Sequence, residues 1–179
     1  MNTIQAVFDP ITTVSAAGYV RGTLFSYAPT LPPPRFRQLD IGFEIDTGSR
    51  YTILLDLDFL ALVRVVCPIP LATPAAVLRW VQTQPDLFVP EGGFWTVGGD
   101  TPPMFRIQYA WMQLTHPDDP DKKGDKEHGS LYGGFSAPFL NPPAPPFPSL
   151  LGRDSLARTS GMVWRRIFGT PRMIEISGA

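Results

Sequence analysis

The residues best suited to chemistry form one short polar segment, Asp46-Thr47-Gly48-Ser49, directly after the apolar segment Phe43–Ile45. An aspartate at the end of a buried strand is held in place, and a glycine beside it lets the backbone turn closely beneath the carboxylate. The Thr and Ser hydroxyl groups can bond to the backbone and to the carboxylate. Two such carboxylates in contact share one proton, so that one can activate a water while the other donates to a carbonyl oxygen.

A second segment, Leu150–Gly152, is a short apolar run that closes on a glycine and is followed by Arg153 and Asp154. Residues 153–160 are compatible with about two helical turns, and Gly161 could end them in a left-handed conformation. We expect Arg153 and Asp154 to form a buried brace that serves structure and not chemistry.

Both segments resemble motifs of one family. Ile45–Ser49, followed by Thr52, looks like the active-site signature of the retropepsin-like aspartic proteases. Leu150–Leu156 resembles the second signature of that family, two apolar residues and Gly-Arg-Asp or Gly-Arg-Asn before a short helix. Thr96–Gly99 is similar to the glycine-containing flap, and the order of the three segments is the order of the family.

The resemblance implies an all-β fold, a closed aspartic-protease (retropepsin-like) barrel with one or two short helices. Residues 1–179 are then a single domain, with insertions at about 63–93 and 116–148 relative to a minimal retroviral enzyme. In the family, the element that corresponds to Leu150–Gly152 packs behind the catalytic loop.

The implied activity is that of an aspartic endopeptidase, which hydrolyses internal peptide bonds. Asp-Thr-Gly occurs only once, so we expect a homodimer in which a two-fold axis brings two copies of Asp46 together. An extended protein or peptide substrate should lie as a strand between the catalytic loop and the flap. Because water is the nucleophile, no cofactor and no metal ion are expected. The assigned residues are Asp46, Thr47 and Gly48 for catalysis, Gly48, Ser49, Gly98 and Gly99 for substrate binding, and Gly152, Arg153 and Asp154 for structural support.

Some features depart from the family pattern. Arg50 stands where retroviral members often have an acid that pairs with the arginine of the second motif, and Arg50 cannot pair with Arg153; Asp154 is a possible substitute. Pro102 and Pro103 should limit hydrogen bonding in the flap. These departures keep an alternative open, a non-catalytic retropepsin-like module that dimerises or binds peptides. The strands expected to seal the dimer are Ile4–Phe8 and Arg172–Ser177.

Composition narrows the class of protein further. A net charge of −1 gives no electrostatic reason to expect nucleic acid or a membrane surface as a partner. No apolar stretch is long enough for a membrane helix and no signal peptide is seen, which predicts a cytoplasmic protein. The one cysteine, Cys67, excludes an internal disulfide and is expected to be a buried thiol.

The remaining pattern predicts the elements that position these residues. We expect strands at 18–27 and 35–45, a helix at 73–83, a hairpin at 94–114 and two strands within 162–176. The charged segment 116–129 should be an exposed loop with solvated His116 and His128, and the proline-rich segment 136–148 should be extended. Asp56 and Asp58 could hold a metal ion with Asp46, but acids on a solvated face or at a helix start fit their spacing better.

Overall fold

The computed structural model describes residues 3–7, 19–29, 35–92, 103–116, 119–140, 145–159, 161–165 and 173–177. These residues form twelve strands in one sheet and four helices. The strands are β1 (Thr3–Val7), β2 (Tyr19–Ala28), β3 (Arg35–Ile45), β4 (Thr52–Leu55), β5 (Phe88–Glu91), β6 (Met104–Ile107), β7 (Ala110–His116), β8 (Asp119–His128), β9 (Leu131–Gly134), β10 (Ser149–Leu151), β11 (Gly161–Arg165) and β12 (Met173–Ser177). The helices are α1 (Asp56–Val66), α2 (Pro74–Gln82), α3 (Ala137–Leu140) and α4 (Arg153–Leu156).

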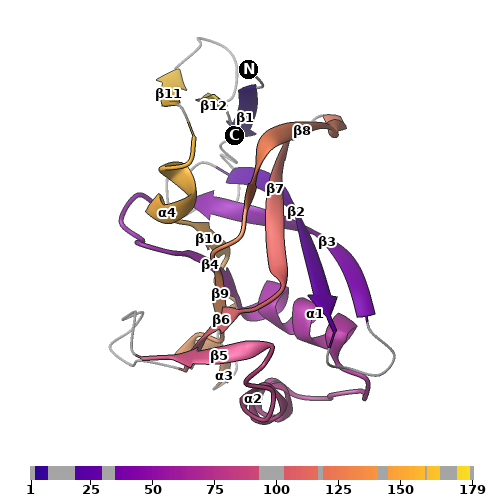
Figure 1. The fold of residues 1–179 in the computed structure, drawn as a ribbon. Coiled ribbons are helices and arrows are strands. Elements are labelled where there is room, and N and C mark those ends of the chain that lie inside the picture. Colours follow the sequence, from indigo (N-terminus) through magenta and orange to yellow (C-terminus); the bar gives the residue numbers. More distant parts are fainter. Residues whose placement is uncertain are drawn as a thin grey trace.

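The sheet is twisted and open. Its strands run in the order β11-β12-β1-β2-β3-β10-β4-β9-β6-β5, and β7 branches from β2 and carries β8 (Figure 1). The prediction of a mostly β fold with short helices is confirmed, but the prediction of a closed barrel is wrong. Among the described strands, β5 and β11 end the sheet without pairing with each other, and the branch at β2 continues the hydrogen bonding outward instead of closing it.

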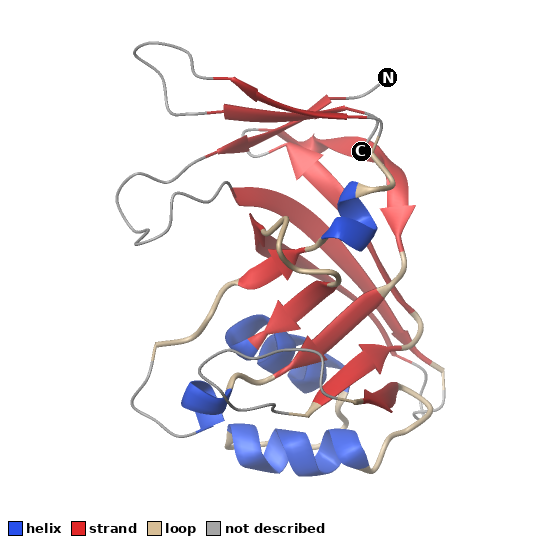
Figure 2. Cartoon of the chain, turned by 90° about the vertical axis from the view of Figure 1, so that its left-hand side faces the viewer, coloured by secondary structure: helices blue, strands red, loops and turns tan. Residues whose placement is uncertain are grey.

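Two helices cover one face of the sheet and form the main core (Figure 2). On α1, Phe59, Leu62, Val63 and Val66 recur at helical spacing and are all buried. The predicted helix at 73–83 is confirmed as α2. It begins here because the Thr73 side chain accepts the backbone N–H of Ala76 at 3.2 Å and Pro74 occupies the first turn. No helix of the described residues is long and apolar enough to cross a membrane.

The predicted exposed loop at 116–129 is wrong, because β8 occupies most of it and pairs with β7. Strand pairing uses backbone groups, so a charged segment can form an edge strand, and charge on such a strand discourages further pairing. The Gln113 side chain also donates to the Gly124 carbonyl at 2.6 Å. His128 is only 1% exposed, which corrects its assignment as a solvated histidine, whereas the side chain of His116 lies outside the described ones.

Residues 94–102 of the predicted hairpin at 94–114 lie outside the described residues. On either side of them β5 and β6 pair antiparallel, with Glu91 opposite Met104. Strand β6 also pairs with β9, whereas β7 pairs with β2 and β8. The chain changes partners at Gln108 and Tyr109, where Tyr109 takes the left-handed backbone conformation with φ of 52°. Gly98 and Gly99, the predicted flap glycines, lie outside the described residues.

Of the other predicted elements, some are confirmed and some are corrected. The strands predicted at 35–45 and within 162–176 are confirmed as β3, β11 and β12. Helix α4 is a single turn at 153–156, and Gly161 belongs to β11 instead of ending a helix. The segment 136–148 contains the short helix α3 and is therefore not wholly extended. Cys67 is buried, as predicted.

Candidate active site

The candidate site is built around β10, which lies between β3 and β4. Strand β10 runs parallel to β3, with Leu151 opposite Ile45, and antiparallel to β4, with Leu150 opposite Ile53. Residues 46–51 therefore leave the sheet on one side of β10 and return on its other side. This loop crosses the end of β10, and we call it the Asp46 loop.

Asp46 is fixed from both sides of its own backbone. Its N–H donates to the Leu151 carbonyl at 3.1 Å, and its carbonyl accepts the Ser49 N–H at 3.2 Å. The carboxylate oxygen Oδ1 accepts the N–H of Gly48 at 2.8 Å. A Cβ atom at Gly48 would stand 3.0 Å from that same oxygen, so glycine gives this tight turn its room. The Asp46 side chain is half-buried, and no described residue hydrogen-bonds its Oδ2 atom.

Of the two hydroxyl groups beside Asp46, that of Ser49 bonds to the backbone. The Ser49 hydroxyl donates to the Tyr51 carbonyl at 2.7 Å and thus closes the loop on itself. Thr47 is exposed. The substrate-binding role of Ser49 and the catalytic role of Thr47 stay predictions.

Residues 152–154, which we call the Gly152 segment, hold the Asp46 loop through backbone hydrogen bonds. The N–H of Arg153 donates to the Ser49 carbonyl at 3.0 Å, and the N–H of Asp154 donates to the Arg50 carbonyl at 3.2 Å. A Cβ atom on Gly152 would lie 2.2 Å from the Tyr51 carbonyl oxygen, which no side chain tolerates. Gly152 is therefore required by the close approach of the two segments.

Thr52 connects these segments from within. Its buried hydroxyl donates to the Asp154 carboxylate at 2.8 Å, lies 2.7 Å from the Ser155 hydroxyl, and accepts the N–H of Gly152 at 3.1 Å. Asp154 also accepts the N–H of Ser155 at 2.7 Å. Asp154 thus braces Thr52, and in the described part of the chain it forms no ion pair with Arg50 or Arg153. The sequence flagged Thr52 only as part of a motif, because its partners stand about a hundred residues later.

A second apolar cluster lies on the opposite side of β4 from the main core, since alternate residues of a strand face opposite sides. It consists of Ile53, Leu55, Met104 and Tyr132, with Tyr51 and Leu150 packed against it. The rings of Tyr51 and Tyr132 lie 4.5 Å apart between centroids.

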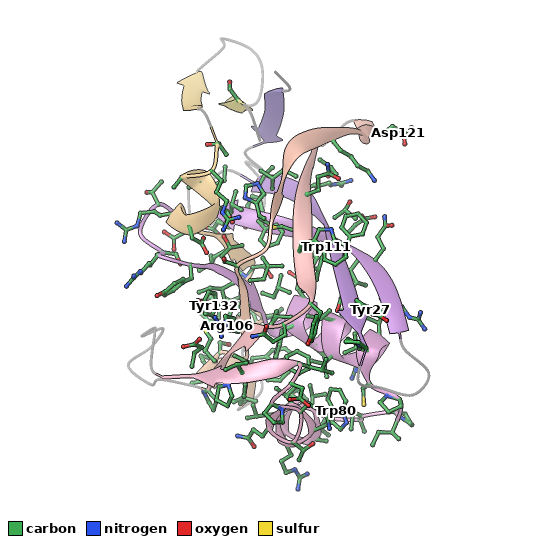
Figure 3. The ribbon with its side chains drawn as sticks, in the orientation of Figure 1. Tyr27, Trp80, Arg106, Trp111, Asp121 and Tyr132 are labelled. Carbon is green, nitrogen blue, oxygen red and sulfur yellow. The ribbon has the colours of Figure 1, made fainter. Side chains whose placement is uncertain are left out.

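The sequence did not single out Tyr132, because only the parallel pairing of β9 with β4 brings it there. Burial, together with the neighbouring Tyr51, raises the pKa of its phenol above the ordinary value. The phenol is therefore neutral over the physiological range. Figure 3 shows Tyr132 and Arg106 close together, to the left of Trp111 and Tyr27 in that view.

Asp56 and Asp58 are helix-start acids, as one interpretation held, but Asp56 is completely buried instead of solvated. Its carboxylate accepts the Ser136 N–H at 2.7 Å, the Ser136 hydroxyl at 2.8 Å and the Phe147 N–H at 2.7 Å. Asp58 accepts the Ser149 hydroxyl at 2.6 Å, and burial raises the pKa of its carboxyl, against a smaller lowering by that hydrogen bond. Within the described residues, no group of three or more His, Cys, Asp or Glu side chains could hold a metal ion.

Comparison with solved structures finds a protein of the kind that the sequence motifs resemble. No protein-family model matches the chain, and no curated protein matches it. A crystal structure of a retropepsin-like aspartic protease from Rickettsia conorii aligns with 99% of this chain and 94% of its own, with a TM-score of 0.47 and 14% sequence identity. The function proposed below is carried by the geometry of the Asp46 loop.

Proposed function

We propose that this protein is an aspartic endopeptidase whose active site forms when two copies of the chain bring their Asp46 side chains together. The observation that carries the proposal is the state of the Asp46 carboxylate. One oxygen is held at 2.8 Å by the Gly48 N–H, while Oδ2 has no partner among the described residues and the side chain is only half-buried. This carboxylate is positioned but still available.

The chemistry follows from pairing two such groups. Two adjacent carboxylates cannot both ionise without strong repulsion, so the pair holds one proton. The ionised carboxylate takes a proton from a water between them, and the water attacks the carbonyl carbon of the peptide bond. The protonated carboxylate donates to the carbonyl oxygen, which gives a neutral tetrahedral intermediate. In the collapse of that intermediate, the carboxyl that took the water proton gives it to the departing amine, and the other carboxylate takes a proton from a hydroxyl of the intermediate.

The surrounding loop suits this role because its geometry is fixed before substrate arrives. Backbone hydrogen bonds tie Asp46 to Leu151, and tie Ser49 and Arg50 to the Gly152 segment. A carboxylate held in this way loses little freedom on reaching the transition state. The exposed backbone of Gly48 is well placed to contact a substrate beside the carboxylate.

A subunit-mixing experiment tests the proposal. Asp46→Asn should reduce kcat/KM on a cleaved peptide by a factor of about a thousand or more, because the variant lacks the general base. When wild-type and variant chains exchange in equal amounts, about one quarter of the wild-type activity should remain at constant total chain, because only dimers with two wild-type chains carry the dyad. Arg79→Gln, a change on the exposed face of α2, serves as the matched mixing partner and should leave activity unchanged.

Two outcomes would contradict the proposal. A residual activity of one half in the equal mixture would mean that each chain acts alone. A wild-type dimer that cleaves no member of a broad peptide library between acidic and neutral pH would favour the non-catalytic module that binds peptides.

The terminal strands bear on how two copies meet. The segments expected to seal the dimer are paired within the chain, since β1 pairs with β12 from Thr3 opposite Ser177 to Val7 opposite Met173. Strand β12 also pairs with β11 on its other side. The end of the sheet that carries both termini therefore presents the outer edge of β11 (Figure 1), and this edge is our candidate for contact between copies.

A further inference from the structure

Two arginines beside the Asp46 loop have no carboxylate partner among the described residues. Arg50 and Arg153 are both exposed, and neither forms an ion pair with any described residue. Arg106, by contrast, lies 3.6 Å from the Glu91 carboxylate. The two unpaired guanidinium groups, together with Tyr51 and Asp154, line an open pocket.

The pocket is anchored at its base. Arg153 and Asp154 are hydrogen-bonded through their N–H groups to the carbonyls of Ser49 and Arg50, so the two arginine side chains start from adjacent, tied backbones. The Arg50 guanidinium lies over the Tyr51 ring, 5.1 Å from its centroid. Such a cation–π contact restrains the side chain through the face of the guanidinium group. The N–H groups, which lie in the plane of that group, can still bind a ligand.

The charge of the pocket is positive. Among the described residues, Asp154 is the one acid that lines it. Its Oδ1 atom accepts hydrogen bonds from the Thr52 hydroxyl and the Ser155 N–H, and its Oδ2 atom is buried. One negative charge stands against two guanidinium groups. An arginine fork binds a carboxylate through parallel hydrogen bonds better than any neutral group.

The pocket is also within reach of a peptide on the candidate dyad. Arg50 follows Asp46 by four residues, so their Cα atoms are at most about 14 Å apart. That distance corresponds to about four residues of an extended peptide. A side chain near the cleaved bond could therefore enter the pocket.

From these observations we propose that Arg50 and Arg153 bind a carboxylate of the peptide substrate, so that the protein selects peptides with Glu or Asp within about four residues of the cleaved bond. The inference rests on the proposed function, because the ligand is taken to be the substrate of the Asp46 dyad. The ring of Tyr51, which lines the pocket and packs against Tyr132 behind it, gives the stem of the acidic side chain an apolar surface.

The test uses peptide pairs that differ only by Glu or Gln at each position around a cleaved bond. At the best position, wild type should show a kcat/KM ratio of about ten in favour of Glu, because a charged hydrogen bond at an exposed site has about that effect. Arg50→Gln should bring the ratio close to one, and Arg50→Glu should favour a Lys peptide. The matched control Arg64→Gln, on the exposed face of α1, should keep the wild-type ratio. Peptides ending in a free carboxylate or in an amide at that position show whether the carboxylate belongs to a side chain or to a C-terminus.

A binding measurement separates this inference from the proposed function. With Asp46→Asn, fluorescence anisotropy of labelled Glu and Gln peptides reports the same preference without turnover. A preference for Glu that Arg50→Gln removes supports the pocket even if wild type cleaves nothing. Equal cleavage of both peptides by wild type would overturn the pocket and leave the endopeptidase intact. A double change, Arg50→Gln with Arg153→Gln, that weakens dimerisation without altering the peptide ratio would also overturn it, because the arginines then pair with an acid of the second copy.

Discussion

Asp46 and Asp56 both stand directly after a buried strand, β3 and β4 respectively, yet their surroundings differ. Asp46 is half-buried, and one of its carboxylate oxygens accepts one hydrogen bond, from Gly48. Asp56 is completely buried and accepts three, from Ser136 and Phe147. A carboxylate whose oxygens accept several hydrogen bonds stabilises the fold, whereas a carboxylate with an unbonded oxygen is available to bind a water or a substrate.

The backbone conformation of Asp56 also reflects its structural role. Asp56 has φ of 43°, in the left-handed region that costs a residue with a side chain about 1 kcal/mol. The three hydrogen bonds offset this cost and connect the start of α1 to Ser136 and Phe147. A carboxylate so fully committed has no capacity left for a water or a substrate, whereas Asp46 keeps Oδ2 available.

The largest effect that this comparison predicts is on stability at Asp56. Asp56→Ala should lower the free energy of unfolding by about 3 kcal/mol or more, because it leaves two buried donors and one part-buried donor without an acceptor. Chemical denaturation of the variant, with Asp86→Ala as an exposed control, measures the loss. A cost no greater than that of the control would show that the three bonds are not what holds Asp56 in place.

Thr52 provides the next largest effect, because it links the two segments that hold Asp46. Thr52→Val keeps the shape but leaves the Gly152 N–H and one bond of Asp154 unmatched, so unfolding should become easier by about 2 kcal/mol. Activity should fall together with stability, since the Asp46 loop loses its inner support. Thr52→Ser, which keeps the hydroxyl, should recover most of both quantities; failure of this rescue would assign the effect to packing.

The position of Asp46 could be predicted from local sequence, and that of Asp56 could not. An apolar strand followed by Asp-Thr-Gly places Asp46 at a strand end whatever the rest of the chain does, and Thr73 with Pro74 starts α2 in the same local way. The burial of Asp56 depends on Ser136, 80 residues later, and on Phe147, 91 residues later. The sequence around Asp56 contains no pattern that predicts those partners.

Strand pairing failed for a related reason. The charged residues of β8 predict a solvated loop because they lack an apolar face, but the hydrogen bonds of β8 come from the edge of β7. Strand β9 is a second case, because its partners β4 and β6 do not adjoin it in sequence. A pattern of side chains shows which face of a strand is buried, but it does not show which backbone edge the strand joins.

A smaller effect is expected at Asp46 itself, and it sharpens the contrast with Asp56. Asp46→Ala removes one hydrogen bond whose donor, the Gly48 N–H, is exposed to water. Its free energy of unfolding should therefore change by less than about 1 kcal/mol, although activity is lost. The same denaturation series as for Asp56→Ala measures it. A loss as large as that of Asp56→Ala would mean that Asp46 is a structural tie as well.

The smallest effect concerns Asp58, which stands between these two extremes with one hydrogen bond, from Ser149, and partial burial. Burial raises the pKa of its carboxyl above the unfolded value of 3.8, so the folded protein holds this proton more tightly than the unfolded chain. The contribution of Asp58 is therefore fully present below pH 3.8 and is lost as pH rises through the folded pKa. Asp58→Asn can still accept the Ser149 hydroxyl and carries no charge, so its stability relative to wild type should rise over that interval and then stay constant. Thermal unfolding of both proteins across the interval measures the difference, and a relative stability that does not change with pH would show that burial does not control this carboxyl.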